Sequence, residues 1–208
     1  MIASLAGRYV TEGDDDALEF TVRSEGGDLV VSPGNAMAFS AIHSTRDVDV
    51  ERCARLSARI KEIVAAHVEN DDLEPLYQAY DGRAPIEALE EGWEAQKQRN
   101  ETEFGALTGY AILGTALRNG RDVTVARYLF ENGYRDSAFV WDPDEEERLL
   151  GRSARGLNPE LRFVPTGEDT FGSWDGGFSD SRPLKFTNDV EGFTLATSTG
   201  HVVAERVK

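Results

Sequence analysis

The sequence contains very few of the residues that build disulfide frameworks and metal sites. Cys53 is the single cysteine in 208 residues, which excludes an internal disulfide and a cysteine-based metal site. The three histidines, His43, His67 and His201, lie far apart, without the short spacing of metal-binding pairs. We therefore expect no metal site and no cofactor.

Long apolar runs are also missing, because no stretch of about 18 apolar residues occurs. We therefore expect no membrane span. The N-terminal stretch MIASLAGRYV lacks the basic region and the apolar core of a signal peptide. This predicts a cytoplasmic protein, or an exported one if the chain is part of a longer precursor.

Basic residues are scarce relative to acidic ones. The chain has 22 lysines and arginines against 38 acidic residues, and its net charge is −16. Such a charge repels polyanions, so we expect no nucleic-acid partner. Solubility alone, or adaptation to high salt, explains an acidic surface of this kind.

Catalytic motifs are absent as well. The acyl-transfer motif Ser-x-x-Lys needs a serine three residues before a lysine, and that position holds Ala58, Glu94, Arg182 or Glu205. The stretch GRSAR has Arg155 where Gly-x-Ser-x-Gly needs its last glycine, and no phosphate-binding glycine loop occurs. No carboxylate–histidine pair stands out for acid–base chemistry. These absences favour a protein that is not an enzyme.

Two acidic runs, EGDDD and DPDEEE, contain the oxygen ligands that Ca²⁺ prefers. Neither run matches the Asp-x-Asp-x-Asp-Gly pattern of calcium loops, so solvated loop tips are the simpler interpretation. The glycine-rich stretch SWDGGFSDS has no following helix to bind phosphate, and we expect a loop there.

Strand patterns occupy residues 5–43. Phe20 and Val22 alternate with polar neighbours, and the stretch EGGD supplies a hairpin turn after them. The stretch AFSAIH is expected to add one more strand.

From about Asp47 the apolar period becomes helical, with Asp47 or Asp49 as a suitable N-cap. LEPLYQAY predicts a short second helix, and Pro85 opens a third one with Trp93 on its apolar face. One face of the first helix carries seven residues: Cys53, Leu56, Ile60, Ile63, Val64, His67 and Val68.

After these helices the apolar period is two again. Asn119-Gly120 and Asn132-Gly133 each predict a type I′ hairpin turn, and ERLLGRSARG predicts a fourth strand. Helices that cover one face of such a meander form an α+β unit. The first three strands are expected over residues 107–118, 121–132 and 135–142.

The first strand pattern resumes at Glu160. LRFVPTGEDTFGSW reads as two strands and the remaining residues as three more, which gives seven or eight with the N-terminal ones. Because only closure removes exposed strand edges, we predict a small antiparallel barrel. The predicted fold is mainly β with an α+β insert. Its parts are a barrel from 1–46 and 158–208 and an insert at 47–157, with helices over about 49–104 and a meander over about 107–153.

One loose sequence pattern runs across the two barrel segments. Its residues are Tyr9, Gly27-Asp28-Leu29, Pro165 to Phe171, Phe186, Gly200 and Ala204 to Val207. It resembles the lipocalin-like C-terminal module of penicillin-binding-protein and β-lactamase-like serine hydrolases. The catalytic domain of those hosts uses Ser-x-x-Lys, which this chain lacks. The resemblance therefore implies a lipocalin-like accessory module without the enzyme.

The middle segment is similar in size and element order to nuclear-transport-factor-2-like domains, in which helices pack on a curved sheet. The resemblance implies a cone with a cavity, and small-ligand pockets combine apolar walls with a few directed polar groups. The alternative is that the aromatic residues simply pack the core. The candidate pocket residues are Tyr77, Tyr80, Trp93, Tyr110, Arg127, Tyr128 and Trp141.

Three functions remain open. The first is a non-catalytic binding module for a small apolar ligand or a protein partner, a second copy of the chain included. The second is a small enzyme that uses Asp136 or a tyrosine as acid or base in the inserted unit. The third is a purely structural or oligomerisation domain. A deep pocket with a buried carboxylate or histidine favours the enzyme, whereas a filled core with an exposed apolar patch favours the module.

Overall fold

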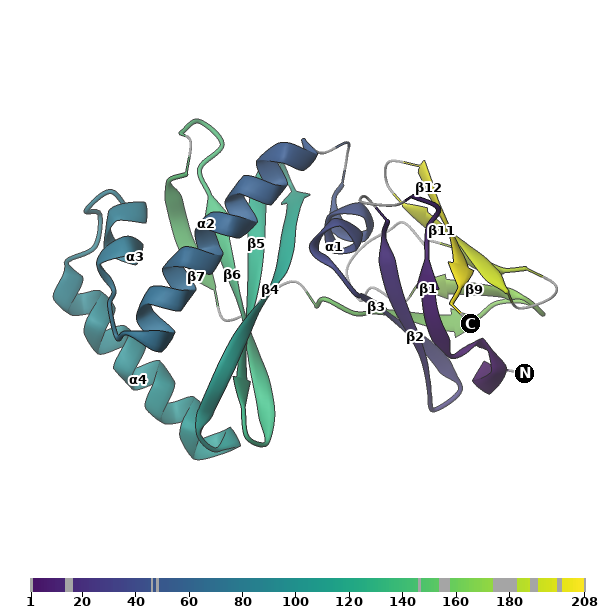
Figure 1. Ribbon diagram of the computed structural model, residues 1–208, viewed down its shortest axis with the longest axis horizontal. Coiled ribbons are helices and arrows are strands. Elements are labelled where there is room, and N and C mark those ends of the chain that lie inside the picture. The colour runs from purple at the N-terminus through teal and green to yellow at the C-terminus, as the bar shows by residue number, and fades with distance from the viewer. Residues whose placement is uncertain are drawn as a thin grey trace. The chain divides into compact units, whose positions relative to one another are not determined.

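The chain forms two compact units (Figure 1). We call Met1–Val48 with Asn158–Lys208 the barrel unit, and Asp49–Leu157 the helix–sheet unit. Most of the predicted loop SWDGGFSDS and the last three residues of EGDDD lie outside the described residues. The computed structural model describes residues 2–13, 17–45, 47, 49–145, 147–153, 158–173, 183–187, 191–197 and 200–207.

Eight antiparallel strands close the barrel unit in the order β1-β12-β11-β10-β9-β8-β3-β2. The predicted mainly β fold with a closed antiparallel barrel is confirmed. Both ends of the sequence contribute, because β1 pairs with β12 and β3 pairs with β8. The strands are β1 (Gly7–Val10), β2 (Glu19–Glu25), β3 (Asp28–Pro33), β8 (Leu161–Pro165), β9 (Thr170–Ser173), β10 (Pro183–Phe186), β11 (Gly192–Thr197) and β12 (Gly200–Arg206).

Aromatic rings fill the inside of this barrel. The ring centroid of Phe193 lies 5.1 Å from that of Tyr9 and 5.7 Å from that of Phe20. Phe186 extends the cluster, at 5.8 Å from Phe193 and 5.9 Å from Phe171. Each of these side chains is at most 2% exposed. The described interior is therefore a packed core, as in small barrels whose inward side chains meet across the axis.

The pairing of β3 with β8 joins segments that are far apart in the sequence. Leu29 lies opposite Phe163 in this register, and both side chains are fully buried. On the outside, Arg162 forms ion pairs with Glu25 at 2.9 Å and Asp28 at 3.1 Å. The pairing of β3 with β8 is thus stabilised by buried apolar side chains on the inside and by exposed ion pairs on the outside.

The predicted strand AFSAIH is wrong, because these residues belong to helix α1 (Ala36–His43). Asn35 caps this helix, since its side chain accepts a hydrogen bond from the Ala38 backbone N–H at 2.8 Å. Ala38 and Ile42, four residues apart, lie on the helix face that joins the barrel core. A short 3-10 helix, η1 (Ile2–Leu5), precedes β1.

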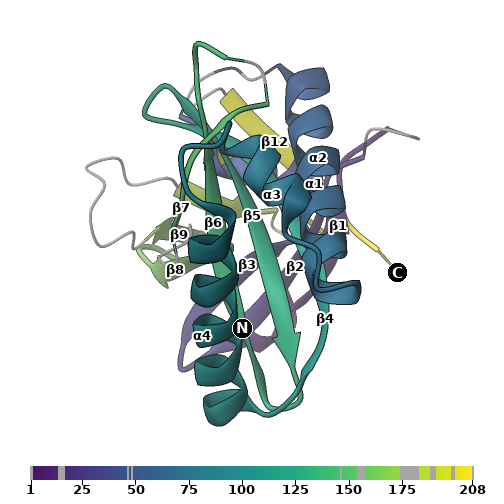
Figure 2. The same ribbon diagram turned by 90° about the vertical axis from the view of Figure 1, so that its left-hand side faces the viewer.

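The helix–sheet unit has three helices on one face of a four-stranded antiparallel sheet (Figure 2). The strands lie in the order β4-β5-β6-β7. The helices are α2 (Val50–Glu69), α3 (Glu74–Ala79) and α4 (Ile86–Phe104). The strands are β4 (Leu107–Arg118), β5 (Arg121–Phe130), β6 (Gly133–Trp141) and β7 (Leu149–Ser153).

The helix ends match the signals in the sequence. Asp49 caps α2, with its side chain accepting from the Arg52 N–H at 2.9 Å. Pro85 precedes α4, and Gly105 ends it with a φ of 82°, a backbone conformation that glycine adopts easily. The predicted apolar face of α2 is buried from Cys53 to His67.

One of the two predicted Asn-Gly turns is confirmed. Asn119 and Gly120 have φ angles of 51° and 77°, as a type I′ turn requires. At the second pair, Phe130 lies opposite Gly133, so Gly133 already belongs to β6 and its φ is not positive. The Asn132 N–H donates to the carbonyl of Phe104 at 2.8 Å, so this turn is bonded to the end of α4.

A row of buried hydroxyl groups connects the sheet to α2. The Trp141 indole N–H donates to the Thr124 hydroxyl at 2.7 Å. Thr124 and Thr115 lie 2.7 Å apart, and Thr115 and Ser57 lie 2.8 Å apart, measured between hydroxyl oxygens. Because an indole only donates, the Thr124 hydroxyl accepts from Trp141, and either hydroxyl can donate in its bond with Thr115. This network fixes α2 across β4 and β5.

Candidate functional site

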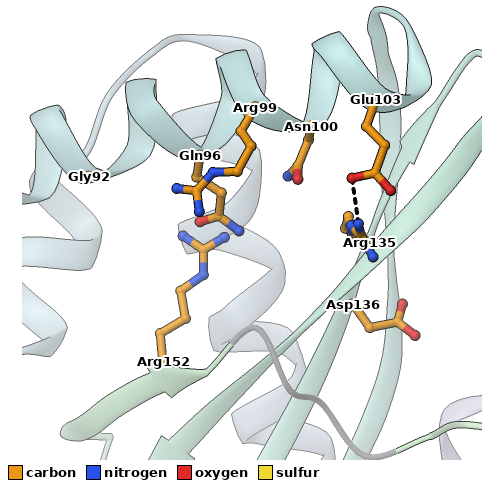
Figure 3. Close-up of a pocket in the computed structure, with 8 residues that line it drawn as sticks. All are labelled: Gly92, Gln96, Arg99, Asn100, Glu103, Arg135, Asp136 and Arg152. Atoms are coloured by element: carbon orange, nitrogen blue, oxygen red, sulfur yellow. Dashed lines mark hydrogen bonds and ion pairs between the residues drawn. The ribbon is translucent and has the colours of Figure 1, made fainter.

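The register of the sheet decides which side chains face the helices. Phe139 in β6 pairs with Arg152 in β7, so both side chains project from the same face. Phe139 belongs to the core that the sheet shares with the helices. Arg152 therefore projects from the last strand toward α4, as Figure 3 shows.

A pocket of about 460 Å³ lies between α4 and the strands β6 and β7 (Figure 3). Its size is within the range of roughly 300–1,000 Å³ that small-ligand sites occupy. Seven of the eight lining residues are polar or charged and the eighth is a glycine, so the walls are not the apolar ones that the sequence predicted. The lining residues are Gly92, Gln96, Arg99, Asn100, Glu103, Arg135, Asp136 and Arg152.

Helix α4 presents two different faces. Gly92, Gln96, Arg99 and Glu103 follow one another at intervals of three or four residues, so they lie on one side of the helix. Trp93 lies on the adjacent side, where it is 6% exposed and packs in the core. The helix is thus anchored by an aromatic residue and offers a polar row to the pocket.

The charges in the pocket do not balance. Glu103 pairs with Arg135 at 2.7 Å, and Asp136 pairs with Arg127 at 2.8 Å. Within the part of the chain that the structure describes, Arg99 and Arg152 form no ion pair. In Figure 3 their guanidinium groups point toward each other near Gln96, and Asp136 points away from them. Two positive charges therefore face one pocket with no carboxylate partner among the described positions.

Aromatic rings hold Arg152 in place. Its guanidinium carbon lies 5.2 Å from the ring centroid of Tyr128, 5.4 Å from that of Phe139 and 5.7 Å from that of Trp93. These distances are within the range of cation–π attraction. One terminal nitrogen donates to the Ser137 hydroxyl at 3.3 Å, and the buried Nε has no hydrogen-bond partner among the described residues.

A buried histidine lies beneath this arginine. The His67 Nε2 atom is 2.9 Å from the Tyr128 hydroxyl, and the His67 ring meets that of Trp93 edge to face, with 4.6 Å between the ring centroids. Burial, with a further contribution from the positive charge of Arg152, lowers the pKa of His67 from 6.5 to about 3. His67 is therefore neutral at physiological pH.

Two tyrosines share this environment. Burial raises the pKa of Tyr128 and of Tyr80, and the charge of Arg152 partly opposes both shifts. Both hydroxyls are therefore protonated at physiological pH. They act as hydrogen-bonding groups and not as bases.

The structure brings three of the predicted pocket residues together, namely Tyr80, Trp93 and Tyr128. All three pack in or against the core of the helix–sheet unit. Arg152 contacts the rings of Trp93 and Tyr128, so these rings lie behind the pocket wall. They support the pocket without lining it.

Of the other four candidates, Trp141 belongs to the same core and Tyr110 packs against it, but both have different partners. Trp141 is fully buried in the hydroxyl network, and Tyr110 donates to Glu69 at 3.1 Å. Tyr77 is half-buried on α3. Arg127 pairs with Asp136 and lies 3.7 Å over the ring of Tyr134, an exposed side chain.

The pocket residues from α4 and β7 were not among the candidates. The α4 row was visible in the sequence as polar side chains at helical spacing beside the Trp93 stripe. Arg152 could not be found in this way, because its direction depends on the pairing of β7 with β6.

Two other surface hollows are less suited to binding a ligand. One, of about 700 Å³, is lined by α4 alone: Glu91, Glu94, Ala95, Lys97, Gln98 and Glu101. A single helix cannot enclose a ligand. The other, of about 500 Å³, lies between Val68–Glu69 and Leu107–Tyr110, where Tyr110 and Glu69 already bond each other.

No group of residues suited to a metal ion occurs among the described positions. In the second acidic run, Asp142 accepts hydrogen bonds from Arg148 at 2.6 Å and 3.1 Å, which lower the pKa of Asp142. Glu145 pairs with the same arginine at 2.6 Å. These carboxylates hold the ends of the β6–β7 loop together. Of the helices described, none is long and apolar enough to cross a membrane.

Comparison of the chain with protein-family models, with curated proteins and with solved structures gives no match. The functional conclusion therefore depends on the geometry of the site.

Proposed function

We propose that the protein is a binding module that holds a small organic molecule in the pocket between α4 and strands β6 and β7. The observation that supports this most directly is the pair of arginines that form no ion pair with any described residue, at one pocket of ligand size. A protein with net charge −16 has many carboxylates that could have neutralised them. Ligand sites use a few placed polar or charged groups to orient the ligand, and the two arginines supply such groups here, although the walls lack the apolar side chains usual in such sites.

Gly92 supports the same proposal independently. Glycine in a helix interior destabilises the helix by roughly 0.5–1 kcal/mol relative to alanine. A Cβ atom at Gly92 would meet no atom within 4 Å, so packing does not require glycine there. Gly92 lines the pocket, and a glycine at this position keeps the space open for a ligand.

For the barrel unit we propose a scaffold role. Its described interior is filled by aromatic side chains, which leaves ligand binding to the helix–sheet unit. We retain as proposals the resemblance of this barrel to lipocalin-like accessory modules and its interruption by a nuclear-transport-factor-2-like insert. A protein partner and a homodimer likewise stay predictions.

A small enzyme is the second candidate, and the neutral His67 beside Tyr128 is the observation that favours it. Both side chains are at most 2% exposed, and neither lines the pocket. Asp136, the predicted acid or base, is held by Arg127 through hydrogen bonds of 2.8 Å and 3.0 Å. Because no acid–base pair faces the pocket among the described residues, we favour binding over catalysis.

A ligand screen by NMR tests the binding function. The full chain is screened against fragments that include anions, cations and neutral molecules, together with Gly92→Leu and Gly92→Ala. The leucine side chain should occupy the pocket and abolish binding, whereas the alanine variant controls for the loss of glycine. Binding that is equal in all three proteins, or no binding at all, would contradict the proposal.

A further inference from the structure

Arg99 and Arg152 indicate the chemical class of the ligand, if the proposed binding function is correct. We infer that the pocket binds a small organic oxyanion, a carboxylate or a phosphate ester, between the guanidinium groups of Arg99 and Arg152.

The charge arrangement is the first argument. The two other charged pairs at the pocket, Glu103–Arg135 and Asp136–Arg127, neutralise themselves. The remaining two guanidinium groups repel each other, since they point toward one another (Figure 3). An oxyanion between them replaces this repulsion with two attractions. A cation in the same place would add to it.

The shape of the donors is the second argument. A guanidinium presents N–H groups in a planar fork that matches the two oxygens of a carboxylate or phosphate. Arg152 is held from behind by the rings of Tyr128, Phe139 and Trp93, so little side-chain freedom is lost when it binds. Arg99 approaches from α4 and is exposed, which leaves it free to adjust.

The other residues that line the pocket indicate which groups the body of the ligand carries. Gln96 and Asn100 each carry an amide that both donates and accepts hydrogen bonds. Gly92 leaves open space beside them, because an added Cβ would meet nothing within 4 Å. A pocket of about 460 Å³ is much larger than a lone carboxylate needs. The ligand body is therefore expected to carry hydroxyl or amide groups.

Four hexose derivatives of similar size test this inference. The probes are glucuronate, glucose 6-phosphate, neutral glucose and cationic glucosamine. Each is titrated into the isotope-labelled full chain, and NMR follows the side-chain N–H signals of Arg99 and Arg152 and the indole signal of Trp93. The titrations are repeated with Arg99→Gln and with Lys97→Gln. Lys97 is the matched control, because it lies on α4, loses the same charge and does not line the pocket.

Glucuronate or glucose 6-phosphate should shift the arginine signals in a saturable way, whereas glucose and glucosamine should not. Arg99→Gln should weaken that binding by roughly tenfold to a hundredfold, since it removes hydrogen bonds to a charged group. Lys97→Gln should leave it nearly unchanged. The stronger of the two anions identifies the head group as carboxylate or phosphate.

The two proposals fail in different ways. If neutral or cationic fragments bind and Gly92→Leu abolishes their binding, the binding function stands and the oxyanion inference is wrong. Anion binding that Arg99→Gln and Lys97→Gln weaken equally is a general charge effect and also overturns the inference. No shift with either anion overturns it as well. If no fragment of any charge binds, the binding function itself is wrong.

Discussion

Acid should destabilise the helix–sheet unit through His67. An unfolded histidine has a pKa of 6.5, whereas the folded His67 has a pKa of about 3. Between these values the unfolded state binds one more proton than the folded state, so the free energy of unfolding rises with pH. The contribution of His67 is therefore lost as the pH falls below about 6.5.

The expected magnitude follows from this proton difference. Lowering the pH from about 7.5 to about 5.5 should reduce the free energy of unfolding by about 1.4 kcal/mol through His67 alone. In this window the folded histidine stays neutral, so the loss depends only on protonation of the unfolded state. A change of about 1.4 kcal/mol is a large share of the total free energy of unfolding of a small unit, so it is measurable.

A variant that cannot titrate isolates the contribution of His67 from that of the carboxylates. His67→Gln removes the ionisable ring and keeps groups that can bond the Tyr128 hydroxyl. Urea unfolding of both proteins is followed at the two pH values by the indole NMR signals of Trp93 and Trp141, which lie in the helix–sheet unit. The stability difference between wild type and variant should shift by about 1.4 kcal/mol in favour of the variant at the lower pH. Equal pH dependence in the two proteins would refute the assignment of a neutral, buried His67.

Four further predictions each concern one substitution. Arg152→Gln should raise the pKa of His67, because the positive charge of Arg152 helps to lower it; an NMR titration of the imidazole that finds no rise would contradict this. Gly92→Ala should stabilise the helix–sheet unit by about 0.5–1 kcal/mol in urea unfolding, since the new methyl group meets no neighbour within 4 Å. Gly133→Ala should instead destabilise it, because its Cβ would lie 2.5 Å from an aromatic ring carbon, and equal stability of the two variants would contradict the packing described. Phe193→Ala should cost the barrel unit about 3–5 kcal/mol, and a loss below about 1 kcal/mol would mean that its interior is not packed.

Local patterns predicted most of the elements but not all of their ends. The barrel strands alternate apolar and polar residues, and the apolar stripe of α2 repeats at helical spacing, so both were visible in the sequence. Helix α1 was not, because its eight residues are few enough to resemble a strand. The turn near Asn132 was predicted, but one residue too late and with the wrong type, because Gly133 already belongs to β6. The hydrogen bond of this turn to Phe104 comes from the end of a distant helix.

The candidate site was predictable only in its location. Aromatic residues such as Trp93 and Tyr128 lie in the unit that holds the pocket, but in the core behind the pocket wall. The residues that line the pocket come from three elements, and their meeting depends on strand register and on how α4 crosses the sheet. Neither is encoded in a short stretch of sequence.

The most direct test of the binding function is to map where bound molecules perturb the protein. The amide and side-chain NMR signals of the full chain are recorded while a binding fragment is added. We predict shifts concentrated on residues 92–103 of α4, on Arg135 to Ser137 and on Arg152. Shifts concentrated in the barrel unit would contradict the account, because they would place ligand binding away from the pocket between α4 and strands β6 and β7.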